Sequence, residues 1–163
     1  MKRITLQEMA VLAVLGVLLG LGKWALAALP NIEIVSLLIM VYTYKFGLRA
    51  LIPVYIFVGI EMVQFGPNLW NIMYLYIWAL LVFAVLPLRK VRKGWVFALV
   101  GGLYGACFGL LCAISYIFTL GWEFALSWLV GGLLYDGLHA AGNFAAALML
   151  YMPLTKALDK IRI

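Results

Sequence analysis

Long apolar segments constrain the fold of this chain most strongly, because most of the sequence belongs to them. Six can be recognised, at residues about 6–29, 32–46, 48–66, 69–87, 94–119 and 133–153. Hydrophobic residues make up 67% of the 163 residues and charged residues 11%, which leaves more apolar surface than a soluble domain of this size can bury. We therefore predict a single all-helical membrane domain over residues 1–163, built as a bundle of six transmembrane helices.

The first segment follows Lys2 and Arg3 and in this respect resembles a signal peptide. Its apolar run continues to Ala28, whereas the core of a signal peptide has about 7–15 residues. We expect it to be a retained first span.

The basic residues predict the orientation of the bundle. All but one of the 12 Lys and Arg residues flank the predicted spans on the same side. These are Lys2, Arg3, Lys45, Arg49, Arg89, Lys90, Arg92, Lys93, Lys156, Lys160 and Arg162. The opposite connections, at residues 29–32, 66–68 and 120–129, contain none. The positive-inside rule therefore predicts a multi-pass protein of the cell membrane with both termini in the cytoplasm. Because the positive charge lies in short loops between spans, it does not indicate a nucleic-acid partner.

The stretch before the last segment allows two interpretations. A single helix over residues 122–153 would be roughly 46 Å long, and the bilayer core is about 30 Å thick. We therefore expect a short helix at the outer surface and a break at Gly131 and Gly132.

Acidic residues gather in the outer half of the predicted bundle, where Glu33, Glu61, Glu123 and Asp136 lie. Acidic residues do not set membrane topology, so this bias needs another cause. A polar cavity that opens outward would supply one.

The first polar group surrounds the connection after the first span. Asn31 is suited to capping the second helix, which would place Glu33 in its first turn. Lys23 is the basic residue outside the basic loops. It could extend toward the membrane interface, or it could face the cavity and pair with Glu33 or with an anionic group of a ligand.

A second group runs from Glu61 to Trp78 and includes Asn68. Asn71, Tyr74 and Trp78 share a helix face by their spacing. An aromatic belt at the interface would account for Trp70, but polar side chains at hydrocarbon depth usually mark a function.

The third group, on the last segment, consists of Asp136, His139 and Asn143, again on one helix face. It could line a small-molecule pocket or form a polar network that holds the helix to its neighbours. The candidate substrate-binding residues are therefore Lys23, Glu33, Glu61, Asn68, Trp70, Asn71, Tyr74, Asp136, His139 and Asn143.

Enzyme motifs are not found. The sequence has no HExxH, GxSxG or P-loop and one histidine, so we expect no catalytic residues. A metal site built from Glu61, Asp136 and His139 matches no known spacing, and we expect neither a metal nor a resident cofactor. Cys107 and Cys112 are interpreted as buried apolar residues.

Small residues recur four apart, at Gly16 and Gly20 and at Gly101, Gly105 and Gly109. Such ridges let helices approach closely in lipid. We interpret them first as internal packing and second as surfaces for docking a partner.

Three stretches resemble the substrate-binding S components of energy-coupling factor (ECF) transporters. They are LPNIEIVSLLIMVYTYKFGLRAL, FGPNLWNIMYLYIWALL and YDGLHAAGNFAAALMLYMPL, and the resemblance covers nearly the whole chain. DGLHAAGNF is the most specific part, since many members carry Asp, His and Asn at this spacing in the sixth helix. Members are six-helix bundles that capture vitamins or related micronutrients outside the cell. They then dock onto a transmembrane coupling subunit with two ATPases, which hydrolyse the ATP.

The resemblance implies ligand contacts from the outer loops and the outer ends of the later helices, and a docking surface on the first helices. The family often carries alanines four apart in the first span, whereas Ala10 and Ala13 are three apart here and Gly16 and Gly20 are four apart. These four residues are the candidate docking set. Trp70, Tyr74 and Trp128 could stack on a flat ring such as a heteroaromatic vitamin. The alternative is a self-sufficient small permease or an intramembrane enzyme.

Overall fold

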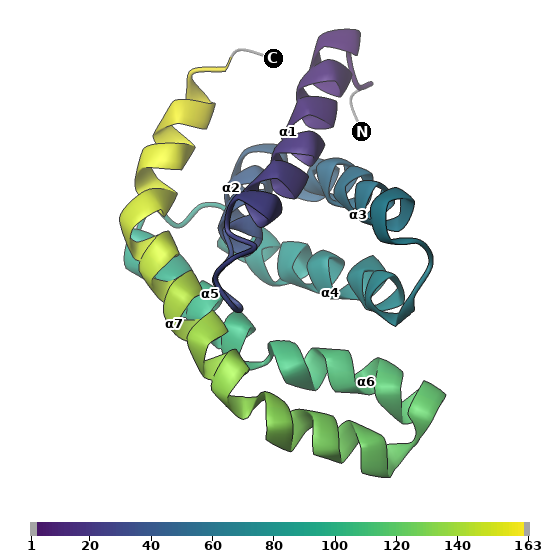
Figure 1. The fold of residues 1–163 in the computed structure, drawn as a ribbon. Coiled ribbons are helices and arrows are strands. Elements are labelled where there is room, and N and C mark those ends of the chain that lie inside the picture. The colour runs from purple at the N-terminus through teal and green to yellow at the C-terminus, as the bar shows by residue number, and fades with distance from the viewer. Residues whose placement is uncertain (1–2, 162–163) are drawn as a thin grey trace.

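The computed structural model describes residues 3–161, and over this range the chain is helical without strands. The helices are α1 (Leu6–Ala25), α2 (Val35–Phe46), α3 (Leu51–Phe65), α4 (Leu69–Val85), α5 (Gly94–Ala106), α6 (Phe108–Leu120) and α7 (Trp122–Asp159). Short 3-10 turns at Gly47–Ala50 and Leu86–Leu88 precede α3 and follow α4. The prediction of an all-helical protein is confirmed (Figure 1).

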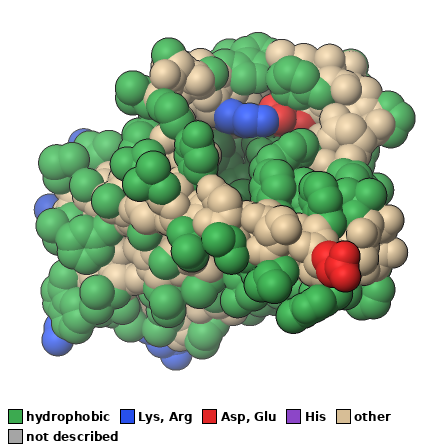
Figure 2. All heavy atoms as spheres, turned by 60° about the horizontal axis from the view of Figure 1, so that its bottom comes forward, with side chains coloured by type: hydrophobic (Ala, Val, Ile, Leu, Met, Phe, Trp, Pro, Cys, Tyr) green, Lys and Arg blue, Asp and Glu red, His purple; other side chains and the backbone are tan. Residues whose placement is uncertain are grey.

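The outer surface of the molecule is apolar. Val63 is 90% exposed and Phe118 is 84% exposed, and hydrophobic side chains cover most of the face in Figure 2. Apolar surface of this extent is typical of contact with lipid. Four helical stretches of the described chain are long and apolar enough to cross a membrane, namely Leu6–Ala25, Val35–Phe65, Leu69–Leu88 and Gly94–Leu120. The predicted last span, 133–153, is not among them and lies within α7.

The start of α2 differs from the prediction. Asn31 does not cap this helix: its φ is 53°, and its side-chain amide donates to the backbone oxygen of Tyr135 at 3.2 Å. The helix begins at Val35, and the carboxylate of Glu33 accepts a hydrogen bond from the backbone N–H of Ser36 at 2.9 Å. Glu33 therefore precedes the first turn and satisfies one of its free N–H groups.

The predicted continuous helix over 94–119 is divided at Cys107 into α5 and α6, which lie at a clear angle in Figure 1. The N–H groups at the start of a helix lack partners within it. Here the N–H of Gly109 donates to Oδ1 of Asp136 at 3.0 Å. Asp136 belongs to α7, so the start of α6 is stabilised by a residue that is distant in the sequence.

The predicted break at Gly131 and Gly132 is wrong, because α7 is continuous over 38 residues. Figure 1 shows how a helix of this length is accommodated: α7 changes direction, with its first part beside α6 and its later part beside α5. A helix can curve without losing its hydrogen bonds, so its full length need not cross the bilayer in one direction.

Small residues bring helices into close contact. A Cβ on Gly105 would lie 2.7 Å from the backbone N of Ala140, so α5 packs directly against the backbone of α7. A Cβ on Gly16 would lie 2.7 Å from Ile56 of α3. Gly16 and Gly20 are buried against α3, whereas Ala10 and Ala13 are exposed on α1. The glycines of the candidate docking set therefore serve internal packing, and the alanines are its exposed members.

Helix ends far apart in the sequence lie near the same part of the molecule. In Figure 1 the first turn of α1 and the last turn of α7 lie at the top, and the α3–α4 and α6–α7 turns lie at the right. Basic residues make contacts at the first turn of α1 and the last turn of α7: Arg49 donates to Oε2 of Glu8 in α1 at 2.7 Å, and the ammonium of Lys45 lies 3.8 Å from Oδ1 of Asp159, the last residue of α7. Lys2 and Arg162, used to predict the orientation, lie outside the described residues.

Candidate functional site

A cavity of about 880 Å³ lies among α1, α3, α4, α6 and α7. All three connections predicted to lie outside the membrane contribute to it, through Asn31, Asn68 and Trp128 among others. Figure 2 shows this hollow, with a basic and an acidic side chain side by side at its edge and hydrophobic side chains around it. Its volume falls within the range of about 300–1,000 Å³ that is typical of small-molecule sites.

Nine of the ten candidate substrate-binding residues line the cavity. They are Lys23, Glu33, Glu61, Asn68, Trp70, Asn71, Tyr74, Asp136 and His139. Asn143 does not. It is 1% exposed and lies one turn beyond His139, with no partner for either side-chain amide atom in residues 3–161. Asn143 shares the helix face of Asp136 and His139, but the cavity ends at His139.

Lys23 faces the cavity and pairs with Glu61, not with Glu33 as the sequence suggested. Glu61 is 2% exposed, and a buried carboxylate needs such a partner because it has lost its hydration. The ammonium of Lys23 also lies 5.1 Å from the ring centroid of Tyr74 and 5.4 Å from that of Phe65. Oε1 of Glu61 has no hydrogen-bond partner among the described residues.

Glu33 and His139 form the second polar contact, with Oε1 and Nε2 3.1 Å apart. An ionised carboxylate only accepts hydrogen bonds, so Nε2 carries the proton of this contact. In the neutral ring, Nδ1 is then an acceptor, and it is buried without a partner in the described chain. The ring of Phe108 packs edge-on against the imidazole at 4.7 Å between centroids and holds its orientation.

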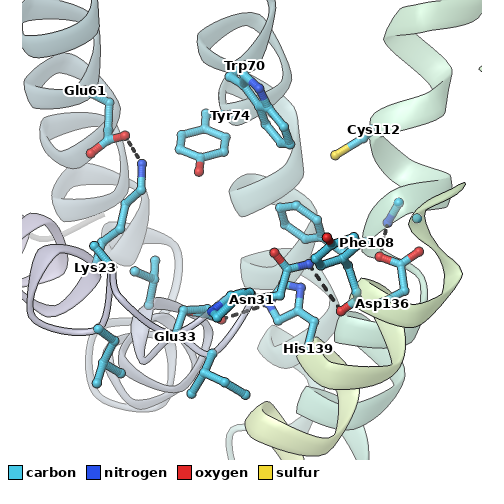
Figure 3. Close-up of a pocket in the computed structure, with 18 of the residues that line it drawn as sticks. Lys23, Asn31, Glu33, Glu61, Trp70, Tyr74, Phe108, Cys112, Asp136 and His139 are labelled. Carbon is cyan, nitrogen blue, oxygen red and sulfur yellow. Dashed lines mark hydrogen bonds and ion pairs between the residues drawn. The ribbon is translucent and has the colours of Figure 1, made fainter. Parts of the chain in front are cut away.

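Asp136 forms the third polar group. Figure 3 shows it on the opposite side of the cavity from the Lys23–Glu61 pair, with Glu33 and His139 below. One carboxylate oxygen of Asp136 accepts from Gly109, as described above. A Cβ on Gly109 would overlap the other oxygen. The missing side chain at this position therefore makes room for the carboxylate at the cavity wall.

Aromatic rings form the wall between these polar groups. Trp70 and Trp128 bring α4 and α7 into contact, with 5.7 Å between ring centroids, and Tyr74 and Trp78 are 5.3 Å apart. The indole N–H of Trp78 is buried without a partner among the residues described. Edge-to-face rings of this kind present flat surfaces to a planar ligand.

Some lining residues were not in the candidate set. Trp78 shares a helix face with Asn71 and Tyr74, so its spacing could have identified it. Phe108 and Cys112 line the cavity because α6 begins anew after Cys107. No local signal in the sequence predicted that division.

A metal site from Glu61, Asp136 and His139 was an alternative. Within residues 3–161, no three His, Cys, Asp or Glu side chains gather closely enough to hold a metal ion. Glu61 and Asp136 lie on different sides of the cavity (Figure 3).

No family model, no curated protein and no solved structure matches this chain.

Proposed function

We propose that this chain is the membrane-embedded substrate-binding subunit, or S component, of an ECF-type transporter. It captures a vitamin or related small micronutrient outside the cell. A transmembrane coupling subunit and two ATPase subunits then drive uptake with ATP. The chain itself performs no catalysis and has no cofactor of its own in this proposal.

The observation that carries the proposal is the convergence of polar residues from distant parts of the chain on one cavity. Asn31, Asn68 and Trp128 line the same space and come from the segment before α2, the N-cap of α4 and the first part of α7. Ionisable groups from α1, α3 and α7 join them in an otherwise apolar protein. Polar groups at such depth are costly to bury and usually serve a function, and a cavity of this size suits a small molecule.

The proposal includes six spans with both termini in the cytoplasm. The first turn of α1 and the last turn of α7 both lie at the top of Figure 1, and basic residues flank these ends in the sequence, as they flank the connections at 45–49 and 89–93. The positive-inside rule then directs the cavity toward the outside. Segment 94–119 crosses as α5 and α6 together, and the later part of α7 supplies the sixth span. The exposed alanines of α1, Ala10 and Ala13, remain available to the coupling subunit.

Reconstitution tests this proposal. The chain is purified in mild detergent, and mass spectrometry identifies the small molecule that it retains. Liposomes are then prepared with the chain alone and with the chain plus an ECF-type coupling module. We expect uptake of the identified compound only with the module and internal ATP. ATP-independent uptake by the chain alone would contradict the proposal and favour a self-sufficient permease.

A further inference from the structure

We infer that the cavity takes a flat nitrogen compound with a net positive charge and several N–H donors, in the manner of an aromatic amidinium. The inference names the substrate class of the cavity and rests on the proposed function. Three independent features of the cavity carry it: the balance of charge, the surroundings of the Lys23 ammonium, and the polar atoms left without partners.

The charge of the cavity lining is negative. Its carboxylates are Glu33, Glu61 and Asp136, and its lysine is Lys23. The lysine is committed to Glu61. Glu33 and Asp136 then flank His139, and the lining stays negative whether the imidazole is neutral or protonated. A buried charge is costly unless an opposite charge accompanies it, so a cationic ligand would neutralise this excess and an anionic ligand would increase it.

The cavity already accommodates one organic cation, which is the ammonium of Lys23. This group lies between the carboxylate of Glu61 and the rings of Tyr74 and Phe65, at 5.1 and 5.4 Å from their centroids. Attraction between a cation and an aromatic face acts within about 6 Å. The remaining wall, with Trp70 and Trp128, offers the same kind of surface to a ligand.

Unpartnered polar atoms of residues in the cavity wall favour a ligand that carries hydrogen-bond donors. Oε1 of Glu61 and, in the neutral imidazole, Nδ1 of His139 are buried acceptors without partners in the described part of the chain. Both residues are at least nine-tenths buried, at 2% and 3% exposed, and both line the cavity. Buried acceptors of this kind require donors. The N–H of Trp78 is the matching unpartnered donor and would bind one acceptor of the ligand.

Three probes of nearly the same shape test the sign of the ligand's charge: benzamidinium, benzamide and benzoate. The full chain is titrated with each, and intrinsic tryptophan fluorescence is recorded, since Trp24, Trp70, Trp78 and Trp128 line the cavity. We expect benzamidinium to bind about tenfold more tightly than benzamide, because hydrogen bonds to charged groups are stronger. Benzoate should bind most weakly.

A charge-changing variant provides the second arm. In Glu61→Gln the charge of Lys23 is no longer balanced, so benzamidinium should lose affinity and benzoate should gain it. Glu123→Gln makes the same change at an exposed site outside the cavity and should leave the order unchanged.

Two results would overturn the inference. One is benzoate binding as tightly as benzamidinium, and the other is no binding of benzamidinium to the wild-type chain. Neither result would contradict the proposed function if the chain retains a compound on purification and that compound is transported with the module. Absence of that transport would instead contradict the proposed function.

Discussion

Lys23→Met is expected to lower the free energy of unfolding by about 3–5 kcal/mol, because it leaves a buried carboxylate without its partner. Glu61 is 2% exposed, and the ammonium of Lys23 is its charged contact. The double variant Lys23→Met/Glu61→Met should recover most of this loss, since an apolar pair of similar volume replaces the ion pair. Unfolding by denaturant in mixed micelles measures all three differences.

A matched control uses the same substitution on a more exposed pair. Lys45 lies 3.8 Å from Asp159, whose side chain is 46% exposed. Lys45→Met should therefore change the free energy of unfolding by about 1 kcal/mol or less. An equal effect of Lys23→Met and Lys45→Met, or a double variant as unstable as Lys23→Met, would show that the Lys23–Glu61 pair does not form.

Substitutions of Asp136 should separate its structural role from its role in binding. Asp136→Ala removes the acceptor of the Gly109 N–H, and a buried N–H without a partner costs about 1–3 kcal/mol. Asp136→Asn keeps an oxygen in that place and should be nearly as stable as the wild type. Both variants remove the charge, and each should weaken binding of the retained compound by about 10- to 100-fold.

Calorimetric titration and thermal unfolding measure the two effects side by side. Glu123→Gln, on the same helix but exposed, is the control for loss of an acidic charge. Unchanged affinity in Asp136→Asn would contradict a role of Asp136 in binding. Equal stability of the Ala and Asn variants would contradict its role at the start of α6.

Helical spacing in the sequence could predict which residues share the helix faces that line the cavity. Asn71 and Tyr74 share a face by their spacing, and so do Asp136 and His139; all four line the cavity. Spacing could not show where along the face the cavity ends, and Asn143 therefore lies beyond it. The depth of a cavity depends on neighbouring helices.

Contacts between distant residues were beyond the reach of local patterns. Lys23 and Glu61 are 38 residues apart, and Gly109 and Asp136 are 27 apart. The contact with Glu61 gives Lys23 a partner inside the protein. The contact between Gly109 and Asp136 stabilises the start of α6, where the predicted span 94–119 is divided. The continuity of α7 was missed for a related reason, because a glycine pair breaks a helix only where the surrounding structure favours a break.

Chemical cross-linking tests most directly whether α4 and α7 meet at one cavity. Cysteines replace Trp70 and Trp128, whose rings lie 5.7 Å apart, in a chain in which Cys107 and Cys112 are changed to Ala. A short bis-maleimide is added, and mass spectrometry of the digested monomer identifies linked peptides. Cysteines in place of Trp95 and Trp122, at the starts of α5 and α7, form the matched control. We predict an intramolecular link between positions 70 and 128 and none between 95 and 122. Absence of the first link, or equal yield of both, would contradict a shared cavity.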